Sequence, residues 1–257
     1  MTYPLPNASI DLTGQVALVT GASSGLGKRF AQVLARCGAK VAVTGRRLER
    51  LEALAEEIIA EGGSAAPLAL DVTDADQLLA VVGQARDALG PVDILINNAG
   101  IPDAQRATKM PVELIDRVLD TNLRAPYILA CEFARQRMEA KLPGRIVNIA
   151  SMAAYDYGGH GAALYSVTKA GVVRMTEALA VEWARFHINV NAIAPGAFAS
   201  EMMDGMLERV GDITRGFSRQ RLGNPAQLDS TLLYLVSPAS DAVTGTCIKV
   251  DDGQGSR

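Results

Sequence analysis

Tyr165 and Lys169 have the residue types and the spacing of an acid/base pair. They are four positions apart, so on a helix they lie on the same face. An ammonium group near a phenol favours the phenolate and lowers the pKa of the tyrosine from its ordinary value of about 10, which suits proton transfer near neutral pH. The same spacing also fits an ordinary amphipathic pair at the start of a helix.

Ser151 supplies a hydroxyl that could assist such chemistry. It follows the apolar run 145–150 and is therefore expected at the carboxyl edge of a sheet, where α/β folds bind ligands. A hydroxyl at that edge can hydrogen-bond a reacting oxygen and stabilise the charge that develops on it. A serine at a strand end is also a common turn former.

The stretch TGASSGLG, at positions 20–27, has the composition of a phosphate-binding loop. Gly21 permits a tight turn, Gly25 lets a ligand approach the backbone, and Gly27 allows a helix and a strand to pack closely. Free N–H groups and the positive end of the helix dipole favour an anion there, so we expect a pyrophosphate. A glycine-rich connection that merely turns the chain remains the alternative.

The elements that would position these motif residues follow a regular pattern. Short apolar runs alternate along the chain with longer segments of helical periodicity. The runs cover residues 16–20, 40–44, 66–70, 92–97, 145–150, 188–193 and 247–250, and the helical segments 25–37, 48–61, 74–89, 112–141, 165–186 and 225–236. Because the runs are nearly continuous in apolar residues, both faces of the sheet should be covered. The sequence predicts a single α/β domain with a parallel sheet and helices on both faces, and only 197–224 lacks clear order.

Composition narrows the classes of function. The 257 residues are 49% hydrophobic, and the net charge of −3 with a pI near 5.5 argues against nucleic acid as a partner. With no apolar segment of membrane-spanning length, we expect a soluble, cytoplasmic protein. Cys37, Cys131 and Cys247 show no pairing pattern, and His160 and His187 have no ligand spacing, so neither a disulfide framework nor a metal site is expected.

Taken together, the motifs resemble those of the classical short-chain dehydrogenase/reductase family over residues 15–253. In family order they are TGASSGLG, Asp71-Val72, NNAG at 97–100, Asn122, Ser151, YSVTK at 165–169 and Pro195-Gly196. The resemblance implies a doubly wound Rossmann fold with seven parallel strands, in one domain with an N-terminal extension at about 1–13 and a substrate loop at about 197–224. It also implies a homo-oligomer, either a tetramer or a dimer.

The resemblance assigns catalytic roles to four residues. Tyr165 would exchange a proton with the oxygen of a carbonyl or alcohol, and Ser151 would stabilise that oxygen. Lys169 would lower the pKa of Tyr165 and hold the nicotinamide ribose, and Asn122 would disturb its helix locally and support a water-linked proton relay. The 14 residues from Ser151 to Tyr165 slightly exceed the family's usual spacing, which bears on the shape of the intervening loop.

A nicotinamide dinucleotide would contact a larger set of residues. Asp71 resembles the residue that bonds the adenine amino group, with Val72 beneath the ring, although DVTD at 71–74 also reads as a helix cap. Asn97 and Asn98 can bond either neighbouring backbone or the adenosine ribose. The expected cofactor-binding residues are Gly21, Ser23, Ser24, Gly25, Leu26, Gly27, Arg46, Arg47, Asp71, Val72, Asn98, Ala99, Gly100, Tyr165, Lys169, Pro195, Gly196, Phe198 and Ser200.

The end of the second apolar run indicates which dinucleotide is preferred. Members that prefer NAD(H) carry an acidic residue there, whereas this chain has Gly45 followed by Arg46 and Arg47. A charge-assisted bond to a 2′-phosphate, at about 1.5 to 3 kcal/mol, favours NADP(H) over NAD(H) by about one to two orders of magnitude. Arg46 is the expected main contact and Arg47 an auxiliary one, unless the two simply form a solvated pair.

The substrate end is less defined. A moderately apolar pocket is expected from Met152, Tyr157, His160, Phe198, Met202, Met203 and Met206. The last three methionines could form a lid or simply pack. VDDGQ at 250–254 departs from the family's usual pattern at Asp252, where subunit contacts are expected.

Three functions are compatible with these motifs. The first is an NADP(H)-dependent oxidoreductase acting on a small-molecule ketone or secondary alcohol, with an NAD(H)-dependent alcohol dehydrogenase as its nearest variant. The second is a non-catalytic dinucleotide-binding protein, although Ser151, Tyr165 and Lys169 are all intact. The third is a sugar-nucleotide epimerase or dehydratase, which the chain length and the glycine spacing fit poorly.

Overall fold

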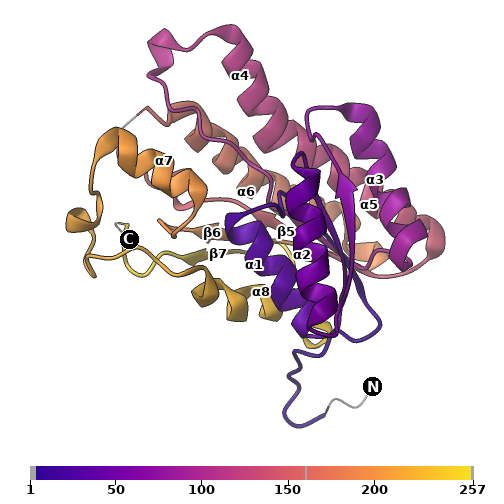
Figure 1. Ribbon diagram of the computed structural model, residues 1–257. Helices are drawn as coiled ribbons and strands as arrows, with labels where there is room; N and C mark the ends of the chain where they lie inside the picture. The colour runs from indigo at the N-terminus through magenta and orange to yellow at the C-terminus, as the bar shows by residue number, and fades with distance from the viewer. Residues whose placement is uncertain (1–3, 160, 256–257) are drawn as a thin grey trace.

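A parallel sheet of seven strands runs through the part of the chain that the structure, a computed structural model, describes: residues 4–159 and 161–255 (Figure 1). Its strands are β1 (Val16–Thr20), β2 (Lys40–Gly45), β3 (Ser64–Ala69), β4 (Ile94–Asn97), β5 (Gly144–Ile149), β6 (Ile188–Pro195) and β7 (Cys247–Val250). Each predicted apolar run forms a strand, with ends shifted by a few residues at most.

The strand order is β3-β2-β1-β4-β5-β6-β7. Leu18 of β1 is paired with Ala42 of β2 on one side and with Leu95 of β4 on the other. The order therefore reverses between β1 and β4, and crossovers on the two sides of this point leave a crevice beyond the carboxyl ends of these strands. The glycine-rich loop follows β1 and NNAG follows β4, so both lie at the reversal point.

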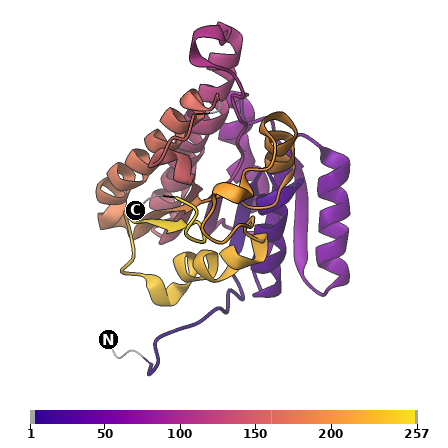
Figure 2. The same cartoon turned by 90° about the vertical axis from the view of Figure 1, so that its left-hand side faces the viewer.

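Helices cover both faces of the sheet, which confirms the doubly wound fold (Figures 1 and 2). One face carries α1 (Gly25–Arg36), α2 (Leu48–Ala60) and α8 (Asp229–Val236), and the other carries α3 (Ala75–Leu89), α5 (Ala125–Ala140) and α6 (Ala163–Trp183). Large buried side chains anchor the two layers: Phe30, Leu51 and Leu232 on the first face, and Leu78, Phe133 and Trp183 on the second. The β-branched strand residues are thus buried from both sides.

The segment 112–141, predicted as one helix, is divided into three. It contains α4 (Val112–Leu119), a π-helical turn (Asp120–Arg124) and α5. The wide turn is centred on Asn122, whose buried side chain bonds the backbone of Ile101 rather than following the helix surface. Such π-helical turns recur at functional sites.

The segment 197–224, where no order was predicted, contains the helix α7 (Glu201–Val210). Ser200 caps it, because its Oγ accepts the N–H of Met203 at 3.2 Å. None of the α7 residues is fully buried, but its half-buried residues lie on one face of the helix at apolar positions with helical spacing: Met203, Met206, Leu207 and Val210. Short 3-10 turns complete the description, at Ala107–Lys109, Met152–Ala154, Ala184–Phe186, Thr214–Gly216, Pro225–Leu228 and Pro238–Ser240.

In the described ranges, no helix has both the length and the apolar character needed to cross a membrane.

Candidate active site

The glycine-rich loop has the shape that the sequence predicts. Gly21 adopts a φ of 66° and Gly25 one of 54°, both in the left-handed region that side chains disfavour. A Cβ on Gly27 would overlap the carbonyl oxygen of Gly21 and the side-chain amide of Asn98, so helix α1 can approach β1 only with glycine there. The first turn of α1 therefore presents its backbone N–H groups beyond the end of β1.

A network of hydrogen bonds joins this loop to NNAG. The Oγ1 of Thr20 accepts the N–H groups of Asn98, at 3.0 Å, and Ala99, at 3.1 Å. The amide of Asn98 donates to the carbonyls of Thr20 at 2.9 Å and Gly21 at 3.2 Å. Asn98 therefore bonds neighbouring backbone, the first of its two predicted alternatives. Thr20 was missed, because nothing in its sequence context separates it from an ordinary strand residue.

Asp71 and Asp74, in the stretch 71–74, have different structural roles. Asp74 caps α3, with its Oδ1 accepting the N–H groups of Asp76 at 2.9 Å and Gln77 at 3.1 Å. Asp71 instead forms a tight turn, in which its Oδ1 accepts from the backbone and hydroxyl of Thr73. Val72 lines a small cavity together with Thr20 and Ala99, which brings it to the reversal point of the sheet.

Ser151, Tyr165 and Lys169 come together at the carboxyl ends of β5 and β6. The side chains of Ser151 and Tyr165 are hydrogen-bonded. Lys169 lies one helical turn beyond Tyr165, with its Nζ 5.6 Å from the centre of the tyrosine ring and 2.7 Å from the carbonyl oxygen of Ile149, to which it donates. The helix α6 thus presents both residues on one face, as their spacing predicts.

Burial shifts the pKa values of both Tyr165 and Lys169. Burial raises the pKa of Tyr165 above its ordinary value, and the hydrogen bond with Ser151 only partly opposes that effect. Burial also lowers the pKa of Lys169 to about 8. Desolvation is thus the largest effect on Tyr165 in this structure, and the lowering of its pKa by Lys169 stays a prediction. Tyr165 holds its proton at neutral pH.

Asn122 faces the same space from the other side. Its Oδ1 accepts the N–H of Ile101 at 2.8 Å, and its Nδ2 donates to the carbonyl of Ile101 at 2.9 Å. A Cβ on Gly100 would lie 3.5 Å from the Oδ1 of Asn122 and 3.6 Å from the Nζ of Lys169. Both polar groups therefore converge on Gly100, and the π-helical turn is what directs Asn122 inward.

Asp103 is a functional candidate that sequence reasoning missed. It is buried, with 2% of its surface exposed, and its Oδ2 accepts the backbone N–H of Tyr165 at 3.0 Å. Its Oδ1 accepts the N–H of Ala104 at 2.8 Å. A carboxylate in a loop of mixed polarity gives no periodic signal, so only the fold shows that it meets the catalytic helix.

An ionic cluster lies where the 2′-phosphate is expected. Arg46 is exposed, whereas the guanidinium of Arg47 bonds the hydroxyls of Ser23 and Ser24 and the carboxylate of Glu201. Arg50, not predicted as a site residue, also pairs with Glu201. Arg47 is thus the arginine that touches the glycine-rich loop, although Arg46 was expected to be the main contact.

The expected substrate pocket is only partly assembled. Phe198 is 4% exposed and packs into the core against Gly223. It also lines a hollow together with Arg219 and Asp252, and its role in a substrate pocket stays a prediction. Met152 is buried in the other core layer, and Tyr157 is exposed. On α7, Met202 is exposed while Met203 and Met206 are half-buried. His160 lies outside the described residues.

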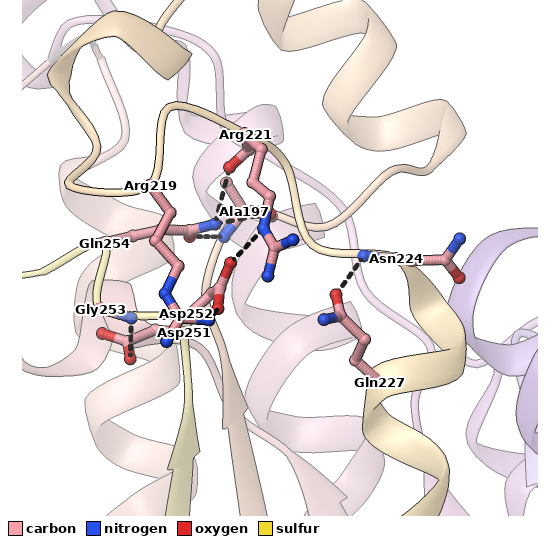
Figure 3. Close-up of polar contacts among 9 residues, drawn as sticks. All are labelled: Ala197, Arg219, Arg221, Asn224, Gln227, Asp251, Asp252, Gly253 and Gln254. Atoms are coloured by element: carbon pink, nitrogen blue, oxygen red, sulfur yellow. Dashed lines mark hydrogen bonds and ion pairs between the residues drawn. The ribbon is translucent and has the colours of Figure 1, made fainter.

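The base of the substrate loop is held by the C-terminal segment (Figure 3). The amide of Gln254 bonds the N–H and the carbonyl of Ala197 and reaches the carbonyl of Arg221 at 3.4 Å. Asp252 pairs with Arg219 and Arg221, both at 2.7 Å. Asp252 therefore makes contacts within its own chain, and they neutralise two arginines of the loop.

Pro195 and Gly196 lie at the start of this loop. Pro195 ends β6, and the N–H of Gly196 donates to the carbonyl of Val250 at 2.9 Å. A Cβ on Gly196 would overlap the amide oxygen of Gln254. Glycine at this position is what lets the C-terminal segment close over the loop.

Comparisons with known proteins identify the family of this chain. The model of the family described as short chain dehydrogenase matches residues 15–210. A 3-oxoacyl-(acyl-carrier-protein) reductase of Synechocystis sp. is 36% identical, covering 94% of this chain and 97% of its own. A gluconate 5-dehydrogenase of Gluconobacter oxydans is also 36% identical, covering 94% and 95%.

A solved structure extends the likeness to three dimensions. An actinorhodin polyketide ketoreductase variant, crystallised with NADPH, superposes with a TM-score of 0.89 at 34% identity, covering 95% of this chain and 98% of its own. The fold of this chain therefore agrees with that of a related enzyme over nearly its whole length. The chain belongs to the short-chain dehydrogenase family.

Proposed function

We propose that the protein transfers a hydride between NADP(H) and a ketone or secondary alcohol. The observation that carries this proposal is the hydrogen-bonded pair Ser151 and Tyr165, with Lys169 one turn away, at the carboxyl edge of the sheet. The glycine-rich loop lies at the nearby reversal point between β1 and β4. A reacting oxygen beside the two hydroxyls would lie within reach of a dinucleotide on that loop.

In the reductive direction, Tyr165 donates its phenolic proton to the carbonyl oxygen of the substrate. Ser151 hydrogen-bonds the same oxygen and stabilises the negative charge that develops on it. Lys169, held by the carbonyl of Ile149, places an ammonium beside the tyrosine ring and favours the phenolate left after proton transfer. When bound, NADPH supplies the hydride.

The chain's residues fit such a cofactor. Gly21 and Gly27 leave a cradle that side chains would fill, and the start of α1 offers backbone N–H groups to a pyrophosphate. Arg47 already bonds a carboxylate at the edge of this loop, so its position suits an anion. The ketoreductase relative was crystallised with NADPH, which supports the same choice here.

Tyr165 is protonated at neutral pH, because its ordinary pKa lies above that range and burial raises it further. The side chain therefore carries the proton that reduction of a carbonyl consumes. The names of the relatives give a 3-oxoacyl group on an acyl-carrier protein and gluconate as their substrates. We therefore propose a ketone on a flexible carbon chain as the substrate class.

We also propose an oligomeric state and a cellular location for the protein. A homo-oligomer in the cytoplasm fits the family, and α6 offers the apolar side chains of Val167 and Val181, which are 62% and 81% exposed. Light scattering of the purified protein would establish the number of subunits, and a monomer would contradict this part of the proposal.

The test is coenzyme oxidation by the purified protein with β-keto esters, ketones and keto-sugars, using NADPH and NADH in parallel. We expect faster turnover with NADPH, and Tyr165→Phe should lower kcat by about 100-fold to 10,000-fold while NADPH binding remains within about twofold. Faster turnover with NADH would contradict the cofactor assignment. Tight coenzyme binding without turnover of any substrate would favour a non-catalytic dinucleotide-binding protein.

A further inference from the structure

The first residue of α7, Glu201, pairs with two arginines at the start of α2. Its Oε2 lies 3.1 Å from the Nη2 of Arg47, and its Oε1 lies 2.6 Å from the Nη1 of Arg50. These arginines lie just beyond the end of β2, in the region expected to hold the 2′-phosphate. A carboxylate of the substrate loop therefore occupies a site where a phosphate is expected.

The same cluster connects α7 to the glycine-rich loop. Arg47 donates to the Oγ of Ser23 at 2.9 Å and to the Oγ of Ser24 at 2.8 Å. A Cβ on Gly25 would lie 3.4 Å from the Cβ of Ser200, so the start of α7 lies against the start of α1 (Figures 1 and 2). These polar contacts join the first residue of α7 to the start of α2.

The carboxylate of Glu201 is negatively charged at neutral pH. Hydrogen bonds from Arg50, Arg47 and Ser24 lower the pKa of Glu201 to about 2. Its side chain is 54% exposed, and those of Arg47 and Arg50 are 38% and 48% exposed, so water and salt reach the cluster. An anion from solution can therefore compete with Glu201 for the two guanidinium groups.

We infer that Glu201 is a specificity-determining residue, which lowers the affinity of the site for the 2′-phosphate of NADP(H) by competing for Arg47 and Arg50. This inference rests on the proposed function, since it assumes that the phosphate is bound here. A dinucleotide without the 2′-phosphate does not compete with the carboxylate. Glu201 thus narrows the preference for NADP(H) over NAD(H), and phosphate binding frees the start of α7 from α2.

Isothermal titration of the cofactor-free protein with 2′,5′-ADP and 5′-AMP, at low ionic strength, tests this inference without catalysis. Glu201→Gln should bind 2′,5′-ADP about threefold to tenfold more tightly than wild type, because two exposed ion pairs no longer compete. Its affinity for 5′-AMP should not change. The gain should shrink at about 0.5 M salt, where exposed charges are screened.

The matched control is Glu208→Gln, which removes the same charge from an exposed position on the same helix. It should leave both affinities unchanged. Glu201→Ala is a second variant with the same expected sign, so that a result does not depend on one substitution.

Two results distinguish a failed inference from a failed cofactor assignment. If wild type prefers 2′,5′-ADP and neither Glu201 variant changes that preference, the competition does not occur and only the inference is overturned. If wild type and both variants bind 2′,5′-ADP and 5′-AMP equally, no 2′-phosphate site exists and the NADP(H) assignment fails as well. Weaker binding of 5′-AMP by Glu201→Gln would show that the carboxylate holds the ribose, which also overturns the inference.

Discussion

The Oδ2 atom of Asp103 accepts the backbone N–H of Tyr165 at 3.0 Å, across 62 positions of sequence. Tyr165 is the third residue of α6, and the residue before that helix, Ala162, offers no side-chain cap. Asp103 therefore acts as the missing cap and fixes the first turn that carries the catalytic tyrosine. It is a positioning residue, and its negative charge also contributes to the raised pKa of Tyr165.

Replacing Asp103 with Asn should separate these two effects. Asparagine keeps one acceptor oxygen but removes the charge, so the pKa of Tyr165 falls, and alcohol oxidation should reach its half-maximal rate at a lower pH than in wild type. Asp103→Ala should also lose about 1 kcal/mol of stability through the missing cap. The measurements are pH profiles of kcat and urea unfolding. Asp116→Asn, at an exposed position on α4, is the control, and an unchanged profile in Asp103→Asn would refute the electrostatic role.

Lys169 should make the stability of the protein depend on pH in a defined direction. Its pKa falls from 10.5 to about 8 on folding, so between these values the unfolded chain binds more protons than the folded one, and stability rises with pH. Relative to Lys169→Met, wild type should gain about 2 kcal/mol in the free energy of unfolding between pH 7 and pH 9.5. Parallel unfolding curves of the two proteins at both pH values measure this gain. A constant difference would mean that Lys169 titrates at its ordinary pKa.

Gly27 and Gly205 form a pair of helical glycines for comparison, the first in the first turn of α1 and the second in the middle of α7. Alanine is intrinsically better in a helix by about 1 kcal/mol, so Gly205→Ala, where a Cβ meets nothing within 4 Å, should leave stability unchanged or improve it. Gly27→Ala should instead destabilise the protein by about 1 to 3 kcal/mol and weaken dinucleotide binding, because its Cβ overlaps backbone. Thermal unfolding and dinucleotide titration provide the comparison. Equal behaviour of the two variants would show that the close approach at Gly27 is not required.

The helices and strands could be predicted from the sequence where apolar residues recur at regular spacing along the chain. Both faces of the strands are apolar, so the sheet was predictable, and the four-residue spacing of Tyr165 and Lys169 survives in α6. The helix α7 was not predicted, although its half-buried apolar residues repeat at helical spacing. Asp103 and Glu201 gave no signal in the sequence, because each finds its partner more than 50 positions away, and only the topology brings them together. Phe198 is predicted in the pocket because its position matches a motif; its side chain packs with the core, and its pocket role stays a prediction.

Gln254 should control the mobility of the substrate loop. It bonds both ends of that loop, at Ala197 and Arg221, so Gln254→Ala removes a shared anchor. Trypsin should then cleave after Arg209 or Arg215 several times faster, because exposed segments that open locally are cut first. Gln84→Ala, at an exposed position on α3, is the control. Cleavage at the wild-type rate would show that the ion pairs of Asp252 are sufficient to hold the loop.

The hydrogen bonds between Thr20 and Asn98 also have a consequence for the folding of the protein. They join residues 78 positions apart, and they hold the glycine-rich loop against the strand that precedes Asn98. A growing chain that ends before residue 98 therefore cannot complete this loop, even though all of its glycines are already present. The phosphate-binding loop is complete only when β4 has paired with β1, so its formation is a long-range step of folding and not a local one.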